Sequence, residues 1–315
     1  MTVGPGTKRE RPRAFAEDWK TVGTARPPTT IANPLRGADM SATPLTEQEV
    51  ASARGVDRSG GIDLAPDGRE VAFAWDVSGP LEVYAAPLAG DRIIQLTGAD
   101  ARSVAPRWSP DGHWVAFVRG VGGRKALWAV DRDGEHEHEI GAGDPLDGRV
   151  TLAAEGVPSW SPDPAPSILD AAGVTYVSGS ATSSLDGSTI AFATSVDGRT
   201  KIAFAGLRDG AVKRVEVLGQ GMPFDDTDPV WRPDGRGVLY RRRDQGNVTV
   251  RRIFTTSHVD EAVMDVPGWI FSPRVGPDSE TVVAVLVDRQ GSDIVVRPKG
   301  AIDILRLTHQ VASGD

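Results

Sequence analysis

A tight corner followed by an apolar run returns five times along this chain. Three corners read Pro-Asp-Gly, one reads Leu-Asp-Gly and one reads Pro-Asp-Ser, and runs such as Val-Ala-Phe come after them. The corner aspartates are Asp67, Asp111, Asp186, Asp234 and Asp278, which are 44, 75, 48 and 44 residues apart. Periods of about 40 to 50 residues are typical of propeller blades rather than of helical arrays. The spacing therefore predicts a repeat fold with one oversized step.

Each repeat can be read as a four-stranded antiparallel sheet. Proline fixes φ, the aspartate side chain bonds its own backbone and glycine takes φ > 0, so the three residues close a hairpin. After the first corner, Val71, Phe73 and Trp75 alternate with Ala72 and Ala74. A strand with two apolar faces is buried on both sides. Because radially packed blades need this pattern, we expect an all-β propeller of five to six four-stranded blades.

Composition and spacing divide the chain into four parts. Residues 1–41 are rich in Pro, Thr and Arg and are expected to form a disordered arm. Up to Met40 the chain carries seven Lys or Arg against four Asp or Glu, a net charge of +3, and Met40 is an alternative start of translation. Residues 42–60 are predicted to hold one short lead-in helix and a linker. Residues 61–310 would form the propeller and residues 311–315 a tail.

The lead-in helix is predicted to run from about residue 47 to residue 54. Thr46 and Glu49 match a capping box, in which each side chain bonds the backbone of the other residue. Gly55 follows as a plausible C-cap. The helix therefore precedes the first repeat directly.

The oversized step leaves the number of blades open at five or six. Val157 to Asp163 resembles the end of a first strand and its corner, but prolines follow where an apolar strand is expected. Residues 141–182 are therefore expected to be either a degenerate blade or a long insertion, and Gly173 to Ser178 is a candidate strand of that blade. An open array would expose apolar blade faces, so either six units close the circle or something else covers the gap.

Composition also narrows the classes of function. The net charge of −8 argues against a general nucleic-acid binder, and no apolar run of about 18 residues is present to span a membrane. We therefore expect neither nucleic acid nor membrane as a partner. The chain has no cysteine, which excludes disulfides and thiolate chemistry and fits a reducing compartment. The basic arm lacks the apolar core of a secretory signal, so a cytoplasmic location is the default expectation.

A dense pattern of charge marks the fourth complete corner as a candidate binding site. Two triplets of opposite charge flank this corner, and they are Arg241, Arg242, Arg243, Asp225, Asp226 and Asp228. The arginines are predicted to end the second strand of the blade, and the aspartates to lie in the loop that leads into it. Because strand direction alternates, both groups would emerge on the same face. The charges then either neutralise one another or hold an anion or a peptide carboxylate, for which arginine geometry is suited.

The histidines supply one weak candidate for a metal site. His136 and His138 are two residues apart, so in a strand their imidazoles would share a face and could meet one metal ion. No third ligand is evident in the sequence, and an exposed outer strand accounts for the pattern as well. We therefore expect no metal and no cofactor.

At this point the residues resemble a known type of repeat. Trp108-Ser-Pro-Asp-Gly112 before Val-Ala-Phe, with Leu-Thr closing the units, is similar to the WD40-like propeller repeat of TolB and of the N-terminal propellers of prolyl oligopeptidase and acylaminoacyl-peptidase-like serine peptidases. The resemblance covers about residues 42–310. It implies a propeller that covers an active site and admits only small unfolded peptides.

The same resemblance gives no catalytic residue. In those peptidases an α/β-hydrolase domain follows the propeller, and its nucleophile needs a Gly-x-Ser-x-Gly elbow, which this chain lacks. We therefore expect a non-catalytic propeller module that binds or covers a peptide or protein partner. One alternative is a truncated or split serine peptidase whose hydrolase domain is on another chain, and another is a TolB-like interaction scaffold. A propeller hydrolase with a central metal is disfavoured, because the channel-lining positions read Asp63, Arg107, Ser159 and Val230.

Overall fold

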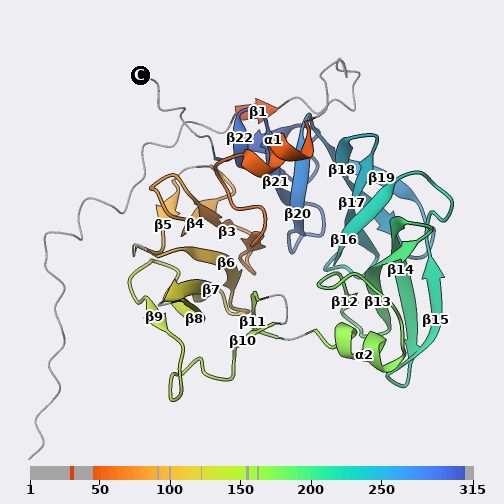
Figure 1. Ribbon diagram of the computed structural model, residues 1–315, viewed down its shortest axis with the longest axis horizontal. Helices are drawn as coiled ribbons and strands as arrows, with labels where there is room; N and C mark the ends of the chain where they lie inside the picture. The colour runs from red at the N-terminus through yellow and green to blue at the C-terminus, as the bar shows by residue number, and fades with distance from the viewer. Residues whose placement is uncertain are drawn as a thin grey trace, which may run out of the picture.

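The structure is a computed structural model that describes residues 29–31, 45–90, 92–98, 101–121, 123–153, 156–161 and 163–308. Within these residues the chain consists mainly of antiparallel sheets, with two short helices. Figure 1 shows that the sheets follow one another in chain order around a common centre. The predicted all-β propeller architecture is confirmed at this level. Neither helix of the described part is long and apolar enough to cross a bilayer.

Four of the sheets have four strands each, paired in simple chain order. The first contains β2 (Asp63–Leu64), β3 (Glu70–Trp75), β4 (Glu82–Pro87) and β5 (Ile94–Gln95). The second contains β6 (Ser103–Trp108), β7 (Trp114–Val121), β8 (Arg124–Asp131) and β9 (His138–Glu139). The third contains β12 (Thr182–Ser183), β13 (Thr189–Val196), β14 (Arg199–Arg208) and β15 (Ala211–Val217). The fourth contains β16 (Asp225–Trp231), β17 (Gly237–Asp244), β18 (Asn247–Phe254) and β19 (Asp260–Asp265).

The last sheet has a fifth strand that the sequence did not predict. It contains β20 (Trp269–Val275), β21 (Val282–Asp288), β22 (Gly291–Arg297), β23 (Ile304–Arg306) and, outermost, β1 (Thr29–Ile31). Residues 29–31 belong to the arm that was expected to be disordered, and in the structure they form this strand. The edge of β23 offers unpaired backbone groups, and β1 pairs with them antiparallel. The rest of the arm, and the tail at 311–315, lie outside the described residues.

The corners are built as their sequence predicts. In all five repeats the corner aspartate accepts a hydrogen bond from the backbone N–H two residues later, at 2.9–3.1 Å. The third corner residue has φ between 61° and 70° throughout, including Ser279, which stands where the other repeats have glycine. The predicted turn mechanism is therefore confirmed in every repeat.

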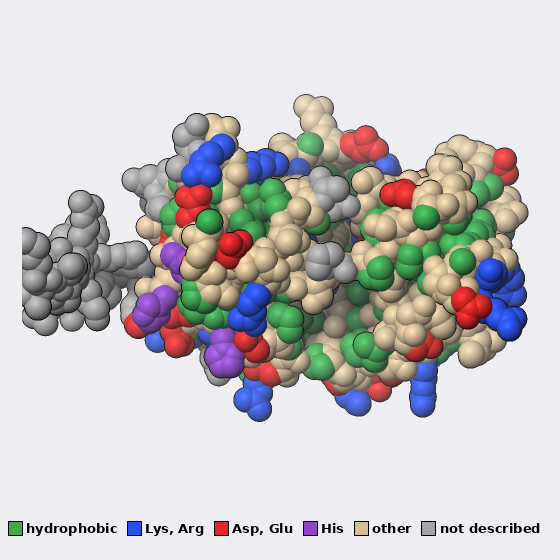
Figure 2. Space-filling model, turned by 90° about the horizontal axis from the view of Figure 1, so that it is seen from below, with side chains coloured by type: hydrophobic (Ala, Val, Ile, Leu, Met, Phe, Trp, Pro, Cys, Tyr) green, Lys and Arg blue, Asp and Glu red, His purple; other side chains and the backbone are tan. Residues whose placement is uncertain are grey.

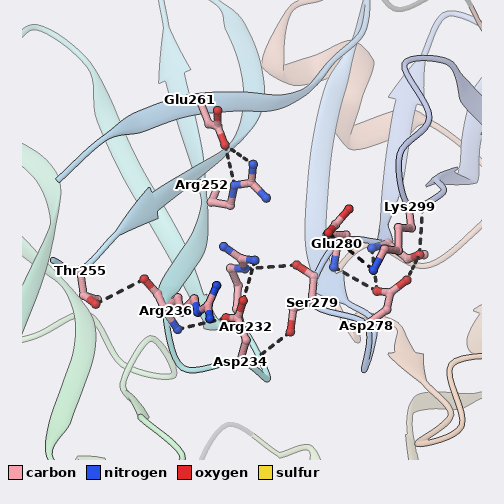
Figure 3. Close-up of polar contacts among 11 residues, drawn as sticks. Arg232, Asp234, Arg236, Arg252, Thr255, Glu261, Asp278, Ser279, Glu280 and Lys299 are labelled. Carbon is pink, nitrogen blue, oxygen red and sulfur yellow. Dashed lines mark hydrogen bonds and ion pairs between the residues drawn. The ribbon is translucent and has the colours of Figure 1, made fainter. Parts of the chain in front are cut away.

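Corners of neighbouring sheets also bond to each other. Figure 3 shows that Arg232 and Asp234, which follow β16, reach Ser279 at the corner after β20. The Ser279 hydroxyl accepts from the N–H of Asp234 at 2.9 Å, and its carbonyl accepts from Nε of Arg232 at 3.1 Å. Serine at this corner thus supplies a contact between sheets that glycine cannot make.

Residues 141–182, which were expected to be either a degenerate blade or a long insertion, contain a two-stranded ribbon and a helix. The ribbon pairs β10 (Thr151–Leu152) with β11 (Pro158–Ser159), and α2 spans Ala165–Ala171. The candidate strand at residues 173–178 is not a strand. Val177 donates one backbone bond to the carbonyl of Ala193, but the N–H of Ala193 donates to the Ser180 hydroxyl, so a side chain interrupts the ladder.

The ribbon and α2 cover the two sheet faces that flank this region. Leu169 of α2 is fully buried against Ile190 and Phe192 of β13. On the other side, Trp160 packs with a cluster that includes Leu146 and the β6–β9 sheet. Seen from below in Figure 2, the surface is hollowed between the left half, where histidine side chains gather, and the right half. Elements other than a four-stranded sheet thus shield these apolar faces.

The lead-in helix is shorter than predicted. α1 spans Glu47–Ser52 and has the expected capping box between Thr46 and Glu49. It ends two residues before the predicted residue 54, because the following backbone is extended and pairs with two sheets.

This extended segment, residues 54–57, joins the first sheet to the last, and we call it the latch. Val56 donates to the carbonyl of Ser292 at 3.0 Å, and Asp57 donates to the carbonyl of Ala74 at 2.8 Å. Gly55 has a φ of 126°, and an added Cβ would lie 2.3 Å from the Ser292 carbonyl oxygen. Apolar residues of the first and last sheets, among them Phe73 and Val285, share one core beneath the latch.

Candidate functional site

The predicted charge cluster lies on two paired strands, not on a loop and a strand. The aspartates were expected in a loop, which is wrong, because they begin strand β16. Antiparallel pairing with β17 sets Asp225 opposite Arg243 and Asp226 opposite Arg242. Cross-strand pairs of opposite charge stabilise a sheet, so these residues can extend the strand where apolar pairs end. All six predicted residues therefore lie near one another.

Arg242 and Asp226 form a buried ion pair. Nε and Nη2 of Arg242 donate to the two carboxylate oxygens of Asp226 at 2.8 and 3.0 Å, and Nη1 donates to Asp260 of β19 at 3.0 Å. The guanidinium also lies 3.5 Å from the ring centroid of Phe224. Burial raises the pKa of Asp226, while Arg242 acts in the opposite direction. This arginine is saturated by partners within its own sheet.

The β6–β9 sheet repeats this arrangement. Arg119 lies eight residues after its corner aspartate, as Arg242 does, and is only 2% exposed. Its Nε donates to Ser103 on the first strand at 3.0 Å, and its Nη1 binds Glu137, which precedes the fourth strand. The guanidinium lies 4.6 Å from the ring centroid of Trp128. Two sheets thus use an arginine to join the first strand to a carboxylate on the fourth strand or immediately before it, which is a structural role.

Arg243 and Asp225 line an open cleft at the end of the same strands. The cleft has a volume of about 440 Å³ and is shared with Arg199, Gln245 and the hairpin turn. Arg243 is 45% exposed and pairs with Glu47 of α1 at 3.0 Å. Arg199 is 50% exposed and pairs with Asp225 at 2.9 Å. Both guanidinium groups therefore remain accessible from solvent.

Arg241 and Asp228 point toward the neighbouring sheet instead. Nε of Arg241 lies 2.6 Å from Asp228, and Nη1 donates to the carbonyl of Ile270 on β20 at 2.9 Å. The guanidinium also lies 4.9 Å from the ring centroid of Phe271. This pair connects β16–β19 to β20–β23.

The two candidate metal-binding histidines have separate carboxylate partners. Nδ1 of His136 binds Asp131, whose hydrogen bond raises the pKa of the imidazole. Nε2 of His138 lies 3.1 Å from Asp144. Within the described ranges, no group of three or more His, Asp or Glu side chains is placed to hold a metal ion. A cavity of about 830 Å³ lies beside His136 and is lined by residues of two turns.

Sequence reasoning expected Asp63 and Arg107 to line the channel, and the structure adds a third charged residue to them. Asp63 of β2, Arg107 of β6 and Arg274 of β20 lie on the innermost strands of three successive sheets. Arg274 was not singled out from the sequence, although a signal exists. In the repeats of Asp111 and Asp278, a proline lies five residues before the corner aspartate and an arginine follows it. Nε of Arg274 lies 3.9 Å from Asp63.

Comparisons of the sequence with known proteins do not assign the chain to a family. No protein-family model matches the chain. An uncharacterised protein of Agrobacterium fabrum is 26% identical over 183 residues, which cover 56% of this chain and 53% of that protein. The chain therefore spans about half the length of this curated relative.

Two solved structures illustrate the structural likeness. The AtxE2 isopeptidase matches with a TM-score of 0.53 over 85% of this chain and 55% of its own, at 14% identity. TolB from Acinetobacter baumannii matches with a TM-score of 0.37 over 89% of this chain and 62% of its own, also at 14% identity. At such identity the likeness to the isopeptidase concerns the fold alone. The antiparallel sheets of this chain, arranged around one centre, define it as an all-β propeller.

Proposed function

We propose that this chain is a non-catalytic propeller of the cytoplasm that binds or covers a peptide or protein partner. The observation that supports this most directly is the open cleft beside α1. There Arg199 and Arg243 are about half exposed, and each pairs with one carboxylate. Exposed ion pairs of this kind contribute little to folding stability, so both arginines can exchange their partners for an acidic peptide.

Peptide binding tests the proposal. A panel of acidic peptides and matched neutral peptides would be titrated by fluorescence polarisation against the wild type and against the double variant Arg199→Gln with Arg243→Gln. We expect an acidic peptide to bind the wild type and to bind the double variant at least tenfold more weakly. Arg214→Gln is the matched control, because Arg214 is 77% exposed and lies on a different strand. Equal affinity for the wild type and the double variant would contradict the assignment of the cleft.

The absence of catalysis needs its own measurement. The purified chain should show no turnover of small amide or ester substrates. An activity that stays constant per mole through successive purification steps would show that the chain is an enzyme.

A second candidate function is the propeller half of a split serine peptidase. It is favoured by the match to the isopeptidase, which covers most of this chain but 55% of that structure. If a neighbouring reading frame encodes an α/β-hydrolase with a Gly-x-Ser-x-Gly elbow, the two purified chains should form a complex of defined stoichiometry. Light scattering after size exclusion would measure it, and separate elution at micromolar concentration would count against this candidate.

A further inference from the structure

Two arginines and one aspartate meet where three sheets approach the centre of the ring. Arg107 of β6 and Arg274 of β20 flank Asp63 of β2, which lies between them in sheet order. The group thus holds two positive charges and one negative charge. Such an excess is unfavourable within a folded protein unless an anion or solvent balances it.

Both arginine side chains make the same hydrogen bond to the backbone of the preceding proline. Nη1 of Arg107 donates to the carbonyl of Pro106 at 2.7 Å, and Nη1 of Arg274 donates to the carbonyl of Pro273 at 3.0 Å. The Nη2 atoms converge on Gly61, where an added Cβ would lie 3.6 Å from that of Arg107 and 3.7 Å from that of Arg274. Among the described residues, neither Nη2 has a hydrogen-bond partner. One side of each guanidinium is therefore fixed and the other side is aimed at a shared space.

Backbone geometry aims the two side chains. Ala105 and Ser272 precede the two prolines and have φ values of 56° and 48°, in the region that favours glycine. The pairing register shifts at both places, between Val104 and Arg107 and between Phe271 and Arg274. A β-bulge redirects the side chain that follows it, and the repeat of Asp234 has the same bulge at Asp228, with Val230 in place of the arginine. The same departure from regular strand geometry thus orients both arginines.

The carboxylate of Asp63 leaves the arginines partly unbalanced. One of its oxygens accepts from the N–H of Trp108 at 2.8 Å, and the other lies 3.9 Å from Nε of Arg274. Burial and the charge of Arg274 lower the pKa of Arg107 to about 10, against the effect of Asp63. Side chains of Asp63 and Arg274 nevertheless remain 23% and 25% exposed, so solvent reaches them. A dissolved anion can follow the same route.

We propose that Arg107 and Arg274 form an oxyanion site at the centre of the propeller, in which the two Nη2 groups hold one carboxylate or phosphate over Gly61. Gly61 contributes by leaving the space for the ligand empty. The site is separate from the cleft at Arg199 and Arg243 and does not depend on the function proposed for that cleft.

Calorimetric titration of the full chain tests the site with three probes. The probes are inorganic phosphate, acetyl-trialanine with a free carboxylate and the same peptide as its amide, all at constant ionic strength. Binding of the carboxylate peptide but not of the amide supports the site with a peptide terminus as ligand. Binding of phosphate alone supports it with a free anion as ligand. Absence of binding by both oxyanions at millimolar concentration overturns the proposal.

Variants with opposite expected effects assign the binding to these residues. Arg107→Gln and Arg274→Gln should each weaken oxyanion binding at least tenfold. Asp63→Asn keeps an acceptor for Trp108 but removes the competing charge, so it should strengthen binding severalfold. Unfolding cannot produce that gain, which keeps the test decisive if an arginine variant is unstable. The matched control Arg214→Gln should leave affinity unchanged, and binding that no central variant alters would refute the site.

Discussion

Ser279 shows how one side chain takes over a position that otherwise calls for glycine. Its φ of 61° matches that of the corner glycines in the other four repeats. A non-glycine residue in this region is strained, but the hydroxyl and carbonyl of Ser279 both bond to the preceding sheet. The Pro-Asp-Ser corner of the fifth repeat, in which serine replaces glycine, therefore serves a contact between sheets.

Substitution of Ser279 separates strain from hydrogen bonding. Ser279→Ala removes the acceptor of the Asp234 N–H and should lower the free energy of unfolding by about 1–2 kcal/mol. Ser279→Gly loses the same bond but relieves the strain, so it should be less destabilising than Ser279→Ala. Urea denaturation of the three proteins measures both differences. Equal stability of the alanine and glycine variants would show that strain at this corner is negligible.

The corner of the third repeat is sensitive to acid. Hydrogen bonds from the Ser184 hydroxyl, and from the N–H and hydroxyl of Ser188, lower the pKa of Asp186 from 3.8 to about 2. A carboxyl with a depressed folded-state pKa stabilises the protein above its unfolded pKa, and this contribution is lost as pH falls toward 2. Carbon-detected NMR titration should find Asp186 ionised at pH 3 in the wild type. In the Ser188→Ala variant, the pKa of Asp186 should lie closer to its ordinary value. A midpoint near 3.8 in the wild type would disprove the assignment.

At the scale of the element, arginines join strands that are not adjacent in a sheet. Arg242 connects β16 to β19 across two strands, and Arg119 makes the equivalent connection in β6–β9. Such pairs were visible in the sequence only as charge, because the carboxylate partners, Asp260 on β19 and Glu137 just before β9, are each 18 residues away from their arginine. The burial of Arg242 and Asp226 explains why the charge cluster, which the sequence suggested as a binding site, contains an ion pair with a structural role.

The two neighbouring arginines of β17 should respond differently to substitution. Arg242→Met leaves Asp226, which is 2% exposed, without its partner and should cost about 3–5 kcal/mol of unfolding free energy. Arg243→Met breaks an exposed pair with Glu47 and a cation–π contact with the Trp269 ring, whose centroid lies 4.4 Å from the guanidinium, and should cost about 1–2 kcal/mol. Denaturation in urea compares the two. Similar losses in both variants would mean that Arg242 is not the structural member of the pair.

At the scale of the whole molecule, α2 replaces a sheet as the cover of an apolar face. Leu169 is fully buried against β13, in the position where a neighbouring sheet would pack. Leu169→Ala should therefore lower the free energy of unfolding by about 2–4 kcal/mol, whereas Leu169→Met, which conserves volume, should cost less than about 1.5 kcal/mol. Thermal and urea unfolding measure these changes. A loss below about 1 kcal/mol in the alanine variant would mean that α2 is only loosely attached.

The repeat corners made the architecture predictable, because each uses local chemistry that the sequence displays. Strand β1 and helix α2 were not predicted, since each forms only where a distant sheet offers an edge or a face to cover. The central group was predicted only in part, because Asp63 and Arg107 were expected to line the channel but Arg274 was not. Asp63, Arg107 and Arg274 are individually ordinary, and only the ring brings together residues that are far apart in the chain. Arg242 was noticed as a charge, but its burial depended on the register of β16 with β17.

The latch has a consequence for the order in which the molecule folds. The bond between the Ser292 hydroxyl and the Val56 carbonyl joins residues 236 positions apart. Loop closure over such a distance is entropically costly and slow compared with the local hairpins. We therefore expect one apolar face of the first sheet to stay uncovered during synthesis until the last sheet has been made. This protein is therefore expected to be most prone to aggregation before the first and last sheets join.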